Sequence, residues 1–191
     1  RQALAIQTDI GNRRSEALVL ANLATVYRER QNTAEAIAHY EQALAIFREL
    51  QNRRDEAIAL GNLGDLHLRA GQHPEAIEYL EASVKLCQEN HIRLGSYYLG
   101  SLALVYTKTG DLDKAEYCMM DAERLASEKD RSARRGVLYC RGGEVALCRR
   151  DAKGAEAAKT AALEIAREVN ARPDSELYRA IDELERAFSA L

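Results

Sequence analysis

Cysteine and histidine are the residues best suited to hold a metal or to act as nucleophile and base, and their spacing supports neither role here. The cysteines form no Cys-x-x-Cys pair, and no Ser-His-Asp order or phosphate loop accompanies the scattered histidines. We therefore expect no metal, no cofactor and no enzymatic activity, with buried thiols in a reducing cytoplasm. The residues concerned are Cys87, Cys118, Cys140, Cys148, His39, His67, His73 and His91.

Charged side chains are the second group with possible chemistry. Between Lys129 and Lys153 lie eight basic and three acidic residues, a local excess of five in a chain of net charge -3. This cluster would suit an acidic peptide, a terminal carboxylate or nucleic-acid phosphate, but a solvated helix end is the favoured interpretation. Few aromatic residues are present to stack on bases, so we do not expect nucleic-acid binding.

Two arginine pairs, Arg13-Arg14 and Arg53-Arg54, precede predicted helices. They could contact a partner, but ion pairs with Glu16 and Glu56, or with the preceding helix, are favoured. No apolar run is long enough to span a membrane and no signal peptide precedes the first helix, so we predict a cytoplasmic protein without membrane contact.

The elements that position these residues form an internal repeat with a period of about forty. Small side chains recur in fixed columns, and small residues let two helices approach closely. Within each unit the apolar residues are spaced by three and four, which predicts helices rather than strands. Gly71 and Gly110 are predicted to end helices, and Asp111 to cap the next one. The columns are Ala24, Gly64, Ala103, Gly143; then Ala36, Ala76, Ala115, Ala155; then Ala43, Ser83, Ala122, Ala162.

The segment LGNLGDLHLRAGQHPEAIEYLEAS carries nearly all of a known signature, with His67 where Tyr27 and Tyr106 supply the usual tyrosine. The pattern resembles the tetratricopeptide repeat, in the forty-residue variety of kinesin light chain and bacterial regulators. The resemblance implies an all-α superhelix of about four and a half helix-turn-helix repeats. The repeats are predicted at residues 11–50, 51–90, 91–129 and 130–170. The fourth departs most, because Gly142, Ala146 and Lys159 replace bulky apolar groups.

Both ends of the chain fit this scheme. Residues 1–10 match the second helix of a repeat, since Ala3 and Ile6 align with Ala43 and Ile46. We therefore predict a truncated repeat there, with an uncapped apolar edge that could form a homodimer and with more repeats or another domain before it. At the other end, residues 173–191 are predicted to form an amphipathic capping helix.

In the resembled family, the first helices line a concave groove that holds an extended peptide. One stripe of each first helix is therefore the predicted lining, beginning apolar and continuing polar. Asn22 and Asn62 stand out, because an asparagine amide can pair with a peptide unit and is disfavoured inside helices. Hydrogen bonding to a neighbouring helix is an equally weighted alternative. The predicted site residues are Asn22, Thr25, Glu29, Asn62, Asp65, Arg69, Tyr97, Ser101, Lys108 and Arg141.

The resemblance implies a protein-interaction module that binds a peptide or partner protein in this groove, inside a larger signalling or regulatory protein. The family's carboxylate clamp is not matched, so a free acidic C-terminal tail is not the expected ligand. The alternative function is an architectural scaffold that self-associates and carries no peptide.

Overall fold

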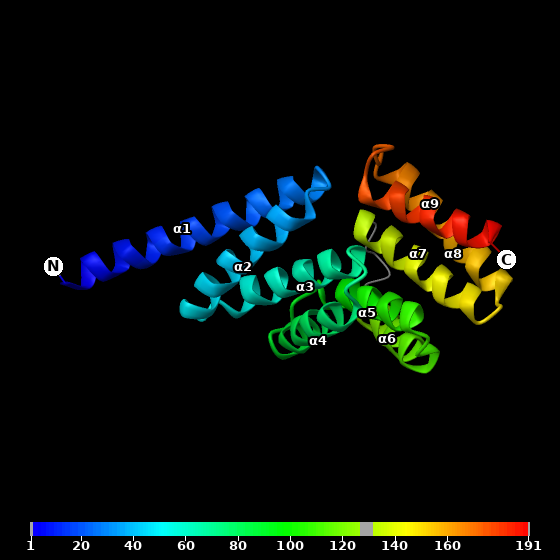
Figure 1. Cartoon of the computed structure of the whole chain (residues 1–191), viewed down its shortest axis with the longest axis horizontal. Helices are drawn as coiled ribbons and strands as arrows, with labels where there is room; N and C mark the ends of the chain where they lie inside the picture. The colour runs from blue at the N-terminus through cyan, green and yellow to red at the C-terminus, as the bar shows by residue number, and fades with distance from the viewer. Residues whose placement is uncertain (1, 127–131, 191) are drawn as a thin grey trace. The chain divides into compact units, whose positions relative to one another are not determined.

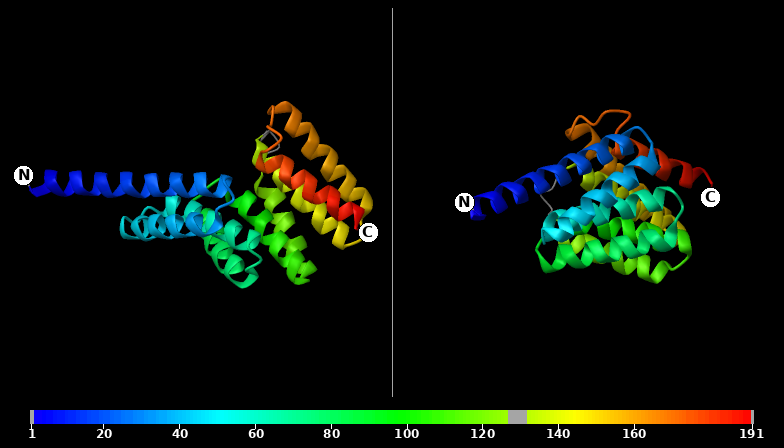
Figure 2. Two further views of the ribbon diagram at one scale, coloured as in Figure 1. Left: turned by 45° about the horizontal axis from the view of Figure 1, so that its top comes forward. Right: turned by 60° about the vertical axis from the view of Figure 1, so that its left-hand side comes forward.

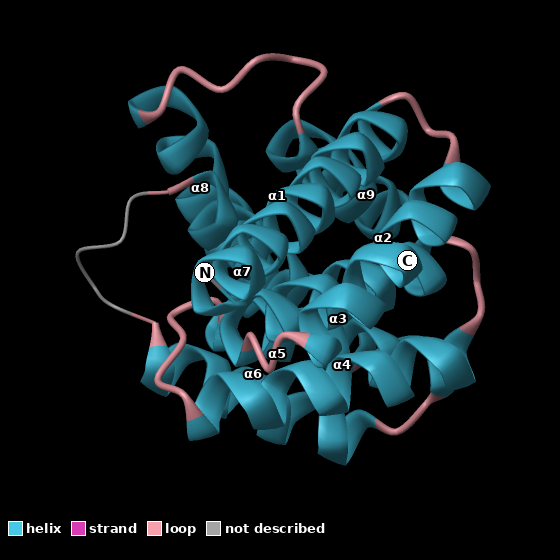
Figure 3. Cartoon of the chain, turned by 90° about the vertical axis from the view of Figure 1, so that its left-hand side faces the viewer, coloured by secondary structure: helices cyan, strands magenta, loops and turns pink. Residues whose placement is uncertain are grey.

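The computed structural model describes residues 2–126 and 132–190, in which every regular element is an α-helix. Figure 3 shows helices joined by short loops. The chain divides into two compact units, Arg1–Ile92 and Arg93–Leu191. The predicted all-α fold of repeated helix pairs is confirmed.

Residues 2–92 of the first unit form four helices, which pack in chain order as an antiparallel series (Figure 1). They are α1 (Gln2–Glu29), α2 (Thr33–Glu49), α3 (Arg53–Arg69) and α4 (His73–Glu89). Their shared core includes Tyr40, Phe47 and Leu63, each at most 2% exposed. Pro74 lies in the first turn of α4, where a missing backbone N–H costs nothing.

Helix α1 differs from the sequence prediction. The match between residues 1–10 and 41–50 predicts two helices with a turn at Gly11-Asn12, where Gln51-Asn52 forms the turn before α3. The structure instead has one uninterrupted helix from Gln2 to Glu29 (Figure 2). This segment contains no proline, and one helical glycine costs only about 1 kcal/mol. A turn would have to be stabilised by packing of the two segments against each other, as α2 packs against α3.

The second unit contains the remaining helices of the described residues. They are α5 (Gly95–Thr109), α6 (Leu112–Leu125), α7 (Ala133–Cys148), α8 (Ala152–Glu168) and α9 (Glu176–Ser189). Helix α5 packs against α6 and α7, and α7 packs against α8 and α9. Leu177, Ile181 and Leu184 of α9 are at most 2% exposed, so this helix covers the apolar face of α7 as the predicted cap.

Close helix approach depends on the columns of small residues. A Cβ placed on Gly64 would lie 2.5 Å from Leu80 Cγ, so α3 and α4 touch where no side chain intervenes. The same holds in the second unit, where a Cβ on Gly143 would lie 2.8 Å from Leu184. Ala36, Ala43 and the other described alanines of these columns are fully buried.

The turns between helices use a left-handed residue. Gly71 and Gly110 have φ values of 74° and 86°, which confirms them as helix-ending residues. Asp111 accepts a hydrogen bond from the Lys114 N–H at 3.2 Å, the predicted N-cap. At the equivalent places Gln31 and Arg150 take positive φ without being glycine, so the left-handed turn position is repeated while the residue type is not.

Candidate functional site

The predicted lining residues of α1 differ in their exposure. Asn22 and Glu29 are exposed, and the Asn22 amide forms no hydrogen bond with another described residue. Thr25 is half-buried, and its hydroxyl donates to the Ala21 carbonyl at 3.0 Å and lies 2.8 Å from the Tyr40 hydroxyl. Since the single Thr25 proton is engaged, Tyr40 donates to Thr25. Thr25 therefore joins α1 to α2, while Asn22 and Glu29 are open to a partner.

The same contrast holds on α3. Asn62 is half-buried, and its amide also forms no hydrogen bond within the described part of the chain. Asp65 is 2% exposed and lies in the interior of the unit, whereas Arg69 is exposed. Each first helix of this unit thus carries one available asparagine and one exposed charged residue, acidic on α1 and basic on α3.

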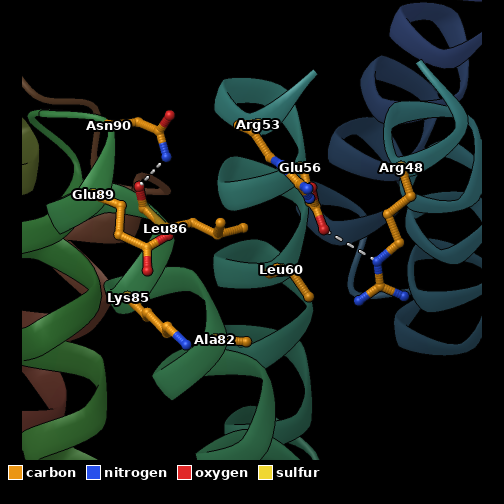
Figure 4. Close-up of a pocket in the computed structure, with 9 residues that line it drawn as sticks. All are labelled: Arg48, Arg53, Glu56, Leu60, Ala82, Lys85, Leu86, Glu89 and Asn90. Carbon is orange, nitrogen blue, oxygen red and sulfur yellow. Dashed lines mark hydrogen bonds and ion pairs between the residues drawn. The ribbon is translucent and has the colours of Figure 1, made fainter. Parts of the chain in front are cut away.

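A pocket of about 460 Å³ lies elsewhere in the first unit, between the end of α2, the start of α3 and the second half of α4 (Figure 4). The sequence analysis did not find it, because three helices must pack before its walls meet. Its floor is apolar and its rim is charged. The lining residues are Arg48, Arg53, Glu56, Leu60, Ala82, Lys85, Leu86, Glu89 and Asn90.

Glu56 orders the charged rim of this pocket. Glu56 is 5% exposed, and its carboxylate accepts hydrogen bonds from Arg53 at 2.8 Å and from Arg48 at 3.2 Å. The equivalent Arg13 pairs with Glu16 at 2.7 Å and with Glu49 at 2.8 Å. The ion-pair interpretation is therefore confirmed for Arg13 and Arg53, whereas Arg14 and Arg54 form no ion pair with another described residue.

In the second unit, three predicted site residues lie together but are buried. Arg141 of α7 donates to the Tyr97 carbonyl at 3.0 Å, and its guanidinium lies 4.3 Å from the centre of the Tyr97 ring. The Tyr97 hydroxyl donates to Glu176 at 2.8 Å. Ser101 is fully buried and donates to the Tyr97 carbonyl at 3.4 Å. These contacts join α5, α7 and the start of α9, so in this arrangement the three side chains stabilise packing.

Lys108 is the predicted residue of the second unit that remains exposed. Its ammonium lies 4.0 Å from the Glu144 carboxylate on α7. Burial raises the pKa of Glu144, and the positive charge of Lys108 opposes this rise. The pair thus places a carboxylate whose charged form is disfavoured by burial beside an exposed ammonium group.

Half of the six described basic residues of the cluster on α7 and α8 are engaged within the unit. Arg149 pairs with Glu116 at 2.7 Å and Asp113 at 3.1 Å, and Arg135 lies 4.8 Å from the Tyr139 ring centre. Arg141 is buried. Lys129, Asp130 and Arg131 lie outside the described residues. These contacts favour a structural role for Arg135, Arg141 and Arg149.

Cysteine and histidine form no metal-binding group among the described residues. Burial raises the pKa of Cys87 to about 11 and of Cys140 to about 12, so both thiols stay protonated at neutral pH. His67 bonds to Gln72 at 2.9 Å and stacks on Tyr79, with ring centres 5.1 Å apart. Within residues 2–126 and 132–190, no helix is both long and apolar enough to cross a membrane.

Comparison with known proteins agrees with this architecture. Tetratricopeptide repeat family models match residues 1–49, 15–89 and 96–129, together well over half of the chain. No curated protein matches the sequence.

Solved structures share the fold at low sequence identity. BtubC (BKLC) from P. vanneervenii superposes with a TM-score of 0.64 and 20% identity, over 82% of this chain and 65% of its own. One structure of a putative kinesin light chain from Podosopora anserina, with nearly identical TPR-like repeats, gives 0.64 and 19%, over 93% and 87% of the two chains. A second structure of that protein gives 0.58 and 17%, over 82% and 77%. The helix pairs, the columns of small residues and the family matches show that this chain belongs to the tetratricopeptide repeat family.

Proposed function

We propose that the chain is a protein-interaction module that binds a peptide or partner protein along the first helices of its repeats, as part of a larger signalling or regulatory protein. Tetratricopeptide repeats are in general protein-protein interaction modules and are typically non-catalytic. The observation that carries the proposal is the pair Asn22 and Asn62. Both lie inside helices, one repeat apart, and neither amide is hydrogen-bonded to another described residue.

An unpaired asparagine within a helix has a cost that binding would offset. Asparagine is disfavoured in helix interiors, because its side chain competes for backbone hydrogen bonds. Its amide offers both a donor and an acceptor, which suits one peptide unit of an extended ligand. Glu29 and Arg69 lie further along the same stripes and are both exposed, so a ligand carrying both signs of charge fits this surface.

The buried predicted residues take a different part in this proposal. Tyr97, Ser101 and Arg141 hold the helices of the second unit together, and Thr25 joins α1 to α2. They therefore fix the helices that present the ligand-binding residues. In the second unit, Lys108 is the proposed contact, since 45% of its side chain is exposed.

The test is selection of peptides from a random display library on the whole chain, followed by fluorescence anisotropy with the peptide selected. The double variant Asn22→Ala/Asn62→Ala removes two hydrogen bonds worth about 1 kcal/mol each, so Kd should rise about 30-fold. Asn32→Ala is the matched control, because Asn32 is exposed, lies in the turn before α2 and makes no side-chain hydrogen bond as its N-cap. Unchanged affinity in the double variant would exclude these stripes as the binding surface.

A self-associating scaffold is the second candidate function. It is favoured by large apolar side chains that α1 exposes. Selection that yields no binding peptide, combined with a chain that dimerises, would support this alternative over the first.

A further inference from the structure

Helix α1 exposes an apolar stripe formed by Val19, Leu23 and Val26, whose side chains are 57%, 41% and 42% exposed. Glu16 and Arg30 continue the stripe at its two ends and are also exposed. Arg30 follows the last residue of α1 and keeps the helical turn, because its N–H donates to the Val26 carbonyl at 3.1 Å. The steps of three, four, three and four along these residues place them on one face of the helix.

The equivalent stripe of α3 is buried by a neighbouring helix. Forty residues further along the chain are Ala59, Leu63 and Leu66, which are at most 2% exposed. They share one hydrophobic core with residues of α2, which packs against α3 in the antiparallel sense because a short turn joins the two helices. The α1 stripe is therefore a surface that, in the next repeat, an antiparallel helix covers.

The ion pairs at the start of the two stripes show what the α1 stripe lacks. The Glu56 carboxylate on α3 accepts hydrogen bonds from Arg53 of its own helix at 2.8 Å and from Arg48 of the covering α2 at 3.2 Å. Within the described part of the chain, Glu16 pairs only with Arg13, the counterpart of Arg53, at 2.7 Å. A covering helix that brought a second arginine to Glu16 would complete the arrangement found at Glu56.

Such an arginine lies at the other end of the same stripe. The Arg30 side chain forms no hydrogen bond or ion pair with another described residue. Its counterpart on α3 is Ala70, so the packing of the repeat does not require an arginine at this position. The stripe is also symmetric along the helix, because Glu16 and Arg30 each lie seven residues from Leu23. An antiparallel copy of the stripe therefore carries an arginine to the position of each glutamate.

We propose that the stripe binds the same stripe of a second copy of this chain, in a two-fold dimer of antiparallel α1 helices. A two-fold axis beside Leu23 places this side chain against its own copy, and Val19 against the partner's Val26. It also places Glu16 against the partner's Arg30, twice in the dimer, so opposite charges close both ends of the apolar contact. In this register every residue of the stripe faces a residue of the stripe in the other copy.

This dimer uses a face of α1 other than the one proposed for peptides. The centre of the apolar stripe lies about 100° around the helix axis from the centre of the stripe that contains Asn22, as the helical repeat requires. The proposal gives the self-associating scaffold, the second candidate function, a defined interface. It rests on that candidate and not on peptide binding.

The first experiment measures the mass of the whole chain by sedimentation velocity over a range of concentrations. The unaltered chain should form a dimer, and Leu23→Glu should raise its Kd at least about 100-fold, because two carboxylates then meet in an apolar contact. Met120→Glu is the matched control, since Met120 is 63% exposed on α6 and should leave the dimer intact. Circular dichroism verifies that both variants fold. A strictly monomeric chain would overturn the proposal and the scaffold function together. A Leu23→Glu variant that dimerises as well as the control would exclude this interface alone.

The second experiment tests the register by exchanging charges. Glu16→Arg and Arg30→Glu are made as separate proteins, and each should raise the dimer Kd about tenfold, because both ends of the contact then carry like charges. An equimolar mixture of the two variants restores both pairs of opposite charge in a mixed dimer, so it should associate nearly as tightly as the unaltered chain. A mixture that associates no more tightly than either variant alone would show that the antiparallel register is wrong.

Discussion

The contact between Gly64 and Leu80 gives a direct test of how small residues determine this fold. A Cβ at position 64 would lie 2.5 Å from Leu80 Cγ, 2.9 Å from its Cδ2 and 3.2 Å from its backbone nitrogen. Cγ is the branch point of leucine, one bond from Cβ, so rotation about χ1 moves it only into other packed atoms. The backbone nitrogen cannot move without shifting α4. Gly64→Ala therefore forces α3 and α4 apart.

Two effects of opposite sign decide the outcome of Gly64→Ala. Replacing glycine by alanine inside a helix stabilises it by about 1 kcal/mol. Overpacking a core costs about 1–3 kcal/mol, and contacts with a branch point and a backbone atom put this site at the upper end. The net expectation is a loss of about 1–2 kcal/mol, which lowers the Tm of a unit of this size by at least about 4 °C.

The assay is urea and thermal unfolding followed by circular dichroism at 222 nm. Gly142→Ala is the matched control, since its Cβ would meet only Met119 Cε, at 3.0 Å, which is the free end of a flexible side chain. That variant should gain about 1 kcal/mol from helix propensity alone. A loss of stability in Gly64→Ala together with a gain in Gly142→Ala would support this reasoning. A Gly64→Ala protein as stable as Gly142→Ala would show that α4 moves at no cost and would refute it.

Three further outcomes follow from buried groups. Burial raises the pKa of Glu144 above its ordinary 4.5, so the ionised carboxylate destabilises the folded state as the pH rises above that value. Glu144→Gln should therefore raise the urea midpoint at pH 7 and leave it unchanged at pH 4. Iodoacetamide at pH 7.5 should modify the exposed Cys148 well before Cys140, whose pKa is about 12, as mass spectrometry of the native protein will show. Glu56→Gln weakens two charge-assisted hydrogen bonds, so it should lower the free energy of unfolding in urea by about 1 kcal/mol. The loss should be smaller in 1 M salt, because both arginines are mostly exposed and salt already screens their charges.

The sequence was sufficient to predict the helix pairs, because each repeat writes the same local signals again. The small residue at Gly64, the turn at Gly71 and the cap at Asp111 each determine structure within a few residues or with the next helix. The break expected at Gly11-Asn12 was not found, although its sequence matches a real turn. A helix boundary of this kind depends on what packs across it, and that information is not local.

The candidate site was less predictable for the same reason. Steps of four and three identify one face of a helix, but they do not say what lies against that face. Asn22 is open, whereas Ser101 and Arg141 on matching stripes are buried by contacts that join α5 to α7. The pocket beside Glu56 required three helices to meet, so no repeat pattern could predict it.

A repeat chain has a property that links its stability to its partners. Every face that is buried within the array has a covering sequence elsewhere in the same chain, because the repeats are alike. When one such face is left exposed, as at Leu23, a helix that resembles α2 is the element expected to cover it. A foreign ligand must instead be recognised by residues that the repeat does not need for packing, and Asn22 and Asn62 are of this kind. Self-association and ligand binding should thus use different faces of α1.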